Sequence, residues 1–133
     1  MKFSKQYRIP FDLCDPSQFI FYGNAFKISH QTIEDFVEHI GIGWDHWFKH
    51  RNFIVPIRHA KAEYFSPLKA GDKINIELSI AKLSPSSVTF LCRLISNKTT
   101  CVEISSVHVF VDKVKSEKSK MPDEFKEKLE RYT

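Results

Sequence analysis

The segment 72–83 constrains the fold most, because its apolar and polar residues alternate along most of its length. The apolar positions are Ile74, Ile76, Leu78 and Ile80, with polar residues between them. A period of two is typical of a strand that buries one face and exposes the other. The segment therefore predicts a strand in a sheet with one face on a core.

Further strands are predicted on both sides of this segment. We expect a first strand within 2–12, one at 53–65 interrupted by Pro56, and two more at 87–96 and 101–112. Short turns rich in Ser, Pro, Gly and Asn separate the last four strands. Consecutive strands joined by such turns indicate an antiparallel sheet.

One long helix is predicted between the first two strands, at about 23–40. Its buried face is expected to carry Ala25, Ser29, Thr32, Ile33, Phe36 and Ile40, which recur at helical spacing. Asn24 is the expected N-cap, and Gly41 is the expected C-terminal stop. The order strand, helix, four strands predicts an α+β fold in which the sheet wraps the helix.

Length and composition indicate one domain over residues 1–133, with a charged tail at 113–133 that includes a short helix. Hydrophobic residues make up 42%, enough for a core without disulfides or metal. Cys14, Cys92 and Cys101 fit neither a disulfide framework nor a zinc site, and His46 and His50 lack a carboxylate helper.

Several partners are excluded by the same composition. The start of the chain lacks an apolar signal core, and no apolar run approaches the roughly 18 residues of a membrane span. We therefore expect a cytoplasmic protein without a membrane partner. The net charge of +4 is too small and too dispersed to indicate nucleic-acid binding.

Asp15 is the candidate catalytic residue, in the loop between the first strand and the helix. Pro16 biases it away from helical geometry. A carboxylate can attack a carbonyl carbon itself or activate water as a general base. Taken alone, Asp15 could equally be an ordinary turn aspartate that caps a loop.

Two motifs favour the catalytic interpretation. Residues 11–24, FDLCDPSQFIFYGN, resemble the active-site signature of the 4-hydroxybenzoyl-CoA thioesterase family, and residues 62–72, AEYFSPLKAGD, resemble its second motif. The chain departs from the family at Gln18, where glycine is usual, and at Leu13, where the family has an additional aspartate. The resemblance covers residues 5–112.

The resemblance implies a hotdog fold, in which an antiparallel five-stranded sheet wraps a long central helix. It also implies acyl-CoA thioesterase activity without a cofactor, with Asp15 facing the thioester. The backbone N–H of Tyr22 would polarise the thioester carbonyl near the start of the helix. Family members assemble as homodimers or homotetramers, which we expect here.

The expected substrate contacts lie on later strands and their turn. Substrate-binding residues are expected at Arg58, His59, Lys82, Ser84, Ser86 and Ser87, several of which suit the phosphates of CoA. For Lys82, Ser84, Ser86 and Ser87, the alternative is that they belong to a solvated turn without a role in binding. Cys14 is expected to pack, and His30 is either a core histidine or a polar contact in the acyl pocket.

The identity of the acyl group is expected from the resemblance alone. Residues 28–34 and 53–60 look most like the branch that hydrolyses 1,4-dihydroxy-2-naphthoyl-CoA in phylloquinone and menaquinone synthesis. The alternatives are a short or medium acyl-CoA, an acyl carrier protein thioester, or a non-catalytic protein that binds an acyl thioester. Trp44, Trp47 and Phe48 could line an aromatic pocket or cover the end of the helix.

Overall fold

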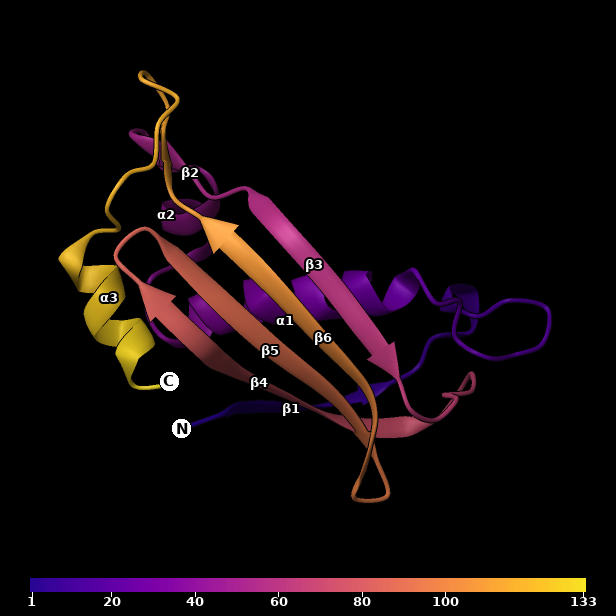
Figure 1. Ribbon diagram of the computed structural model, residues 1–133. Helices are drawn as coiled ribbons and strands as arrows, with labels where there is room; N and C mark the ends of the chain where they lie inside the picture. The colour runs from indigo at the N-terminus through magenta and orange to yellow at the C-terminus, as the bar shows by residue number, and fades with distance from the viewer.

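A curved antiparallel sheet forms the body of the molecule in the computed structural model, which describes all 133 residues (Figure 1). Its strands lie in the order β1-β4-β5-β6-β3. Their bounds are β1 Phe3–Arg8, β4 Lys73–Ser84, β5 Ser87–Ser96, β6 Thr99–Val109 and β3 Ile57–Tyr64. All four neighbouring pairs are antiparallel. The predicted α+β fold with five antiparallel strands is confirmed.

Helix α1, Asn24–His39, crosses the concave face of the sheet (Figure 1). Its buried residues are Ala25, Ile28, Ser29, Thr32, Ile33, Phe36 and Val37. Gly41 follows the helix with a φ of 83°, a conformation that glycine adopts freely, as the sequence predicts. The prediction of Asn24 as N-cap is wrong. Gly23 holds that position, and the Asn24 side chain instead donates from Nδ2 to the carbonyl of Leu13 at 2.8 Å.

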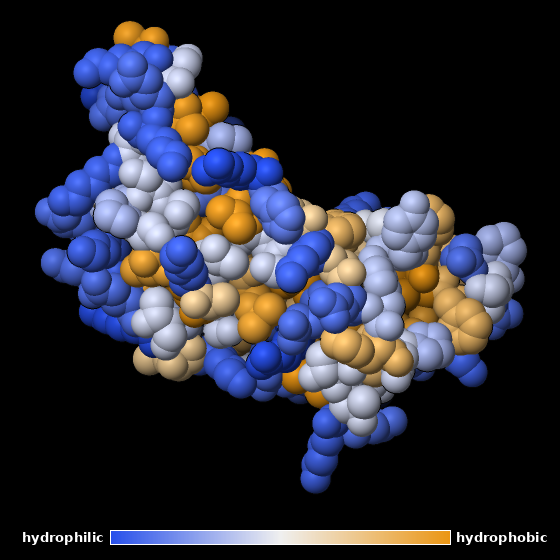
Figure 2. Space-filling model, viewed as in Figure 1, coloured by the Kyte–Doolittle hydropathy of each residue, from blue (hydrophilic) through white to orange (hydrophobic).

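Alternation along the strands sorts the side chains onto two faces. On β4, the four predicted apolar residues are buried beneath α1, and the residues between them point to the outer face. The outer face shows polar and apolar side chains side by side (Figure 2).

Two predicted strands are divided. Residues 53–65 form β2, Phe53–Ile54, and β3, with Pro56 between them as expected. The strand expected at 101–112 ends at Val109, and β7, Val111–Asp112, pairs with β2 in a separate ribbon. Phe110 breaks the ladder because it is fully buried and its N–H bonds to the carbonyl of Ser86 at 2.8 Å.

Two short helices close the end of the sheet beside β2 and β7. They are α2, Trp44–Phe48, and α3, Asp123–Glu130. The rings of Trp47 and Phe125 stack at 5.6 Å, and Phe110 packs edge-on against Trp47 at 5.4 Å. Trp47 thus belongs to the core, whereas Trp44 and Phe48 lie near the side of α1. None of the helices is long and apolar enough to cross a membrane.

Strand β3 is an exposed edge. Seven of its eight residues are exposed, and only Ala62 is half-buried. Its second backbone edge has no neighbour in the chain. Such an edge is a ready template for pairing with another strand.

Candidate functional site

A tight hairpin presents Asp15 just before α1. The N–H of Asp15 donates to the carbonyl of Phe19 at 2.9 Å, and the N–H of Gln18 donates to the carbonyl of Asp15 at 2.8 Å. Gln18 has a φ of 72°, in the left-handed region. This pairing is that of a β-turn followed by a bulge, whose left-handed position is usually glycine. The structure thus explains why glycine is usual where this chain has Gln18.

The carboxylate of Asp15 is oriented by Ser17. Its Oδ1 accepts hydrogen bonds from the backbone N–H of Ser17, at 2.8 Å, and from the Ser17 hydroxyl. Its Oδ2 accepts none from the chain, and the residue is half-buried. One oxygen is therefore held in place while the other stays available for proton transfer or attack.

The two sequence motifs are joined by backbone hydrogen bonds. The N–H of Ile20 donates to the carbonyl of Leu68 at 2.8 Å, and the N–H of Ala70 donates to the carbonyl of Gln18 at 3.0 Å. The connection between β3 and β4 therefore forms one side of the hairpin that carries Asp15. Leu68 is fully buried and fixes this connection to the core.

The backbone N–H of Tyr22 is free. The neighbouring N–H groups of Phe21 and Asn24 bond to the carbonyls of Leu13 and Phe21 at 3.0 and 2.9 Å, but that of Tyr22 has no acceptor in the chain. It lies two residues before α1, where the helix dipole favours negative charge. Such a donor suits the oxyanion of a tetrahedral intermediate.

An apolar hollow of about 300 Å³ lies beside this hairpin. Six of its eight lining residues are hydrophobic. They come from the hairpin, the end of β3 and the start of β6: Phe19, Ile20, Tyr22, Tyr64, Phe65, Ser66, Pro67 and Val102. The hollow can bury the apolar part of a small ligand next to Tyr22.

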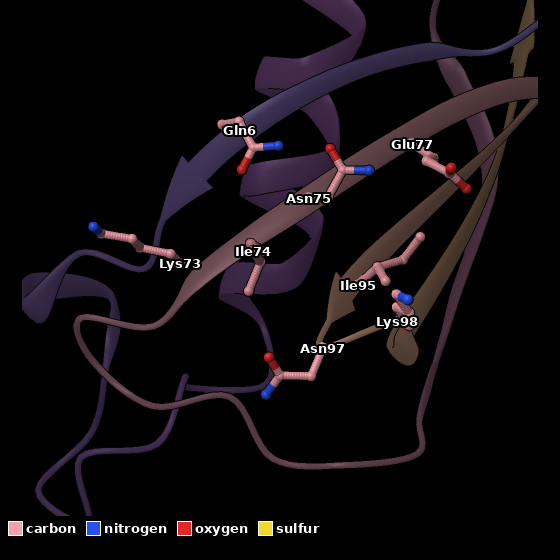
Figure 3. Close-up of a pocket in the computed structure, with 8 residues that line it drawn as sticks. All are labelled: Gln6, Lys73, Ile74, Asn75, Glu77, Ile95, Asn97 and Lys98. Atoms are coloured by element: carbon pink, nitrogen blue, oxygen red, sulfur yellow. The ribbon is translucent and has the colours of Figure 1, made fainter.

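A larger hollow, of about 480 Å³, has a different character (Figure 3). It lies over β1, β4 and the turn between β5 and β6, and only two of its eight lining residues are hydrophobic. Gln6, Asn75 and Glu77 stand on the strands with α1 passing behind them (Figure 3). This hollow is polar and belongs to the outer face, so it does not suit an acyl group.

The expected substrate-binding residues lie at the other end of the sheet from Asp15. The hairpin contacts Tyr64 at the end of β3, whereas Arg58 and His59 lie near its start. Ile57 aligns through His108 and Val88 with Leu83, so the turn that carries Lys82, Ser84, Ser86 and Ser87 shares that distant end. Arg58 and Tyr64 are about 20 Å apart along β3, at roughly 3.3 Å per residue. A single chain thus does not bring these residues to Asp15.

Cys14 adjoins Asp15 but is not set up as a nucleophile. Burial and the charges of Asp15, Asp72 and Asp12 raise the pKa of its thiol. The sulfur contacts the carbonyl of Pro10 at 3.6 Å and packs against the core. The protonated thiol is a weak nucleophile, so the carboxylate of Asp15 remains the candidate for the reactive group of the hairpin.

A polar cluster lies between α1 and β6, and of its members the sequence singles out only His30 as a possible polar contact. His30 Nδ1 lies 3.2 Å from Glu34 Oε2, and Glu34 Oε1 accepts a hydrogen bond from Trp44 Nε1 at 2.7 Å. On β6, His108 Nε2 lies 2.9 Å from the hydroxyl of Ser106. Only the alternation of Ser106 and His108 with Ser105 and Val107 could have placed them on the inner face.

Comparison with known proteins agrees with this geometry. The family model described as the Thioesterase-like superfamily matches residues 18–129. A 1,4-dihydroxy-2-naphthoyl-CoA hydrolase of Nostoc punctiforme is 24% identical over 130 residues, covering 98% of this chain and 88% of the relative.

Solved structures share the fold. A 1,4-dihydroxy-2-naphthoyl-CoA thioesterase from Synechocystis superposes with a TM-score of 0.89 at 14% identity, covering 97% of this chain and 96% of the other. A Staphylococcus aureus protein solved in complex with CoA also has a TM-score of 0.89 at 14% identity, over 99% and 84% of the two chains.

The family match extends over most of the chain, from Gln18, three residues after Asp15, to Leu129 in α3. The solved thioesterase confirms the hotdog fold that the resemblance implies. The thioester hydrolase activity expected from the two motifs is likewise confirmed at the level of the family. The chain belongs to the Thioesterase-like superfamily.

Proposed function

We propose that this protein hydrolyses an aromatic acyl-CoA thioester, with Asp15 as the catalytic carboxylate and the Tyr22 N–H as the oxyanion donor. The observation that carries the proposal is their common placement. The oriented carboxylate and the unpaired N–H belong to one hairpin that leads into α1, next to an apolar hollow. The relatives named for 1,4-dihydroxy-2-naphthoyl-CoA support an aromatic acyl group.

The reaction needs an oxygen nucleophile and a place for negative charge. Asp15 takes a proton from water as the water oxygen bonds to the carbonyl carbon, and the oxyanion accepts a hydrogen bond from the Tyr22 N–H. The C–S bond then breaks, and the CoA sulfur leaves with a proton. In the alternative course, Asp15 itself attacks, CoA leaves, and water hydrolyses the mixed anhydride.

A second copy of the chain would complete the site. A two-fold pairing of β3 with its copy runs the two strands antiparallel, so the start of one strand meets the end of the other. Arg58 and His59 of one protomer would then lie near Tyr64 and Tyr22 of its partner. This assembly, a homodimer that can pair into a homotetramer, accounts for the exposure of β3 and for the distance between Asp15 and the expected CoA contacts.

The remaining expectations follow from the same proposal. The three cysteines are unpaired, as is usual in a reducing compartment, so we place the protein in the cytoplasm. In this proposal the residues of the hairpin provide the catalytic groups, and the reaction uses no cofactor or metal. Hydrolysis of short or medium acyl-CoA, or of an acyl carrier protein thioester, and binding without turnover are the alternatives that an experiment must separate.

The test is release of free thiol from a panel of thioesters by wild type and Asp15→Asn. We expect hydrolysis of 1,4-dihydroxy-2-naphthoyl-CoA but not of palmitoyl-CoA, and a loss of about 10³-fold in kcat in the variant. Asp12→Asn is the matched control, since that carboxylate belongs to the same loop but not to the hairpin. Equal rates for Asp15→Asn and wild type would refute the proposal.

Single turnover in ¹⁸O-labelled water, with rapid quenching, separates the two courses. Label in the carboxylate of Asp15 indicates direct attack with water adding to the Asp15 carbonyl of the anhydride. Label in the released acid alone arises either from general-base catalysis or from water adding to the acyl carbonyl of the anhydride, and a covalent acyl-enzyme in the quenched sample identifies the second case. Sedimentation of the protein tests the assembly, and a monomer at assay concentration would contradict the shared site.

A further inference from the structure

We propose that a hollow beside α2 binds a phosphate group, with Lys49, His50 and Arg51 as its donors. The hollow has a volume of about 390 Å³, and none of its lining residues is hydrophobic. It belongs to the end of the sheet where α2 and β2 lie together (Figure 1). The 16 residues of α1, about 24 Å at 1.5 Å per residue, separate this end from the hairpin that carries Asp15. The phosphate site is therefore distinct from the proposed catalytic site and does not depend on it.

Positive charge gathers around the hollow without carboxylate partners. Lys49 and Arg51 line it. Lys113, which follows β7, is held close by, because its N–H donates to the carbonyl of Asn52 at 3.0 Å. None of the three cations forms an ion pair with a carboxylate of the chain. Like charges so placed repel one another, and an anion between them relieves the repulsion.

The ring of His50 is fixed with a donor to spare. It stacks on Phe53 with ring centroids 3.8 Å apart and 15° from parallel. The backbone N–H of Asn52 donates to its Nδ1 at 3.1 Å, so the proton of the neutral ring lies on Nε2. A fixed ring with a free N–H gives the hollow a directional donor to a phosphate oxygen, beside the charged donors of Lys49 and Arg51.

The pKa of His50 responds to the same positive charge. Burial lowers this pKa, and the charges of His46, Lys113 and Arg51 lower it further. These groups act on the ring from α2, from the segment after β7 and from the loop before β2, while α3 contributes the uncharged ring of Phe125. An anion in the hollow would offset these cations, so it should raise the pKa of His50.

One carboxylate also lines the hollow. Asp45 is exposed, and its negative charge disfavours an anion. Lys49, Arg51 and Lys113 outnumber it, so the charge around the hollow stays positive. The opposing effect of Asp45 gives the proposal a test of sign, because removing this charge should strengthen binding.

A divalent metal is the competing occupant. His46 and His50 are four residues apart with ring centroids 5.0 Å apart, as two metal ligands can be. However, Nδ1 of His50 already accepts a hydrogen bond, and no group of three His, Cys, Asp or Glu residues in the chain could hold a metal ion. The unpaired cations repel a metal ion and attract an oxyanion, so the charges favour phosphate.

The test follows the histidine ring resonances of the full chain by NMR while inorganic phosphate is added. Sodium chloride is adjusted to keep the ionic strength constant, because screening alone alters the interactions between exposed charges. At saturating phosphate the pKa of His50 should rise by about one pH unit. The resonances of His39, at the end of α1, should not respond.

Charge variants then identify the donors. Arg51→Gln should weaken phosphate binding about tenfold, and Lys113→Gln, which acts from outside the lining, about threefold. Lys27→Gln is the matched control, since it removes the same charge from an exposed position on α1 and should leave the affinity unchanged. Asp45→Asn should tighten binding about threefold.

A phosphate free in solution and one carried by a nucleotide share this chemistry, so adenosine 3′,5′-bisphosphate is titrated beside inorganic phosphate. Either ligand supports the site, and the tighter of the two identifies its source. No response of His50 to either anion, or equal affinities in Arg51→Gln and Lys27→Gln, would overturn the proposal. A response to Zn²⁺ in place of phosphate would show that the hollow is a metal site.

Discussion

The hydroxyl of Tyr64, at the end of β3, donates a hydrogen bond to the backbone carbonyl of Tyr22. The edge strand thereby holds the peptide that follows the Tyr22 N–H, the proposed oxyanion donor. Tyr64→Phe should lower kcat about fivefold, which corresponds to the roughly 1 kcal/mol of one hydrogen bond, with little change in KM. Tyr7→Phe on β1 is the control. An unchanged kcat for Tyr64→Phe would show that the peptide is held without this contact.

Ser17 should matter to the reaction through its hydrogen bonds to Asp15. Removing its hydroxyl frees the Asp15 carboxylate from one of two hydrogen bonds, so we expect Ser17→Ala to lose about tenfold in kcat. Ser17→Thr keeps the hydroxyl and should restore most of the rate. Steady-state kinetics of both variants, with Ser79→Ala as control, check this. Equal losses in Ser17→Ala and Ser17→Thr would count against orientation by the hydroxyl.

Replacing Gln18 by glycine should stabilise the folded protein. A non-glycine residue in the left-handed region costs about 1–2 kcal/mol, and part of this is offset by the flexibility of glycine in the unfolded chain. Gln18→Gly should therefore raise the free energy of unfolding by about 1 kcal/mol, whereas Gln18→Ala should give no such gain. Urea unfolding of both variants measures the difference. A less stable Gln18→Gly would contradict the strain at this position.

His108 should make the fold sensitive to acid. Its pKa is about 4 in the folded protein and about 6.5 when unfolded, so between these values the unfolded chain binds the extra proton. The stability it contributes is present above pH 6.5 and is lost as the pH falls toward 4, by up to about 3 kcal/mol. Urea unfolding from pH 7 to 4 measures this, with His39→Gln as control. Titration of the His108 ring near pH 6.5 would rule out the effect.

The spacing of apolar residues predicts the main sheet and its helix. An element that buries one face carries apolar residues at the repeat of that element, two residues in a strand and about 3.6 in a helix. The alternation in β4 and the apolar stripe of α1 have their expected places. The strand expected at 101–112 fails at Phe110 because hydropathy alone does not distinguish a residue in a ladder from one that packs beside Trp47. The prediction of Asn24 as N-cap fails because its side chain donates to the carbonyl of Leu13, a tertiary contact that the local sequence does not show.

The candidate site could be predicted only where a local motif carries it. Asp15 and Tyr22 belong to one short stretch, so their roles remain a coherent prediction that the hairpin geometry supports. Arg58 and Lys82 are far from Asp15 within a chain, because the sheet register decides which end of a strand each residue occupies. The pairing of His30 with His108 depends on how α1 is rotated over β6, which no local pattern reveals.

The hydrogen bonds from Ile20 to Leu68 and from Ala70 to Gln18 make the position of the Asp15 carboxylate, the proposed catalytic group, depend on a segment that has no proposed role in the chemistry. The length of the connection between β3 and β4 sets the position of the hairpin. One residue inserted between Pro67 and Gly71 would slide these contacts out of register and move Asp15 away from the Tyr22 N–H. Substitutions on the wall of the apolar hollow beside Tyr22 would leave these contacts in place. The length of this connection should therefore be less free to change than the side chains that line the hollow.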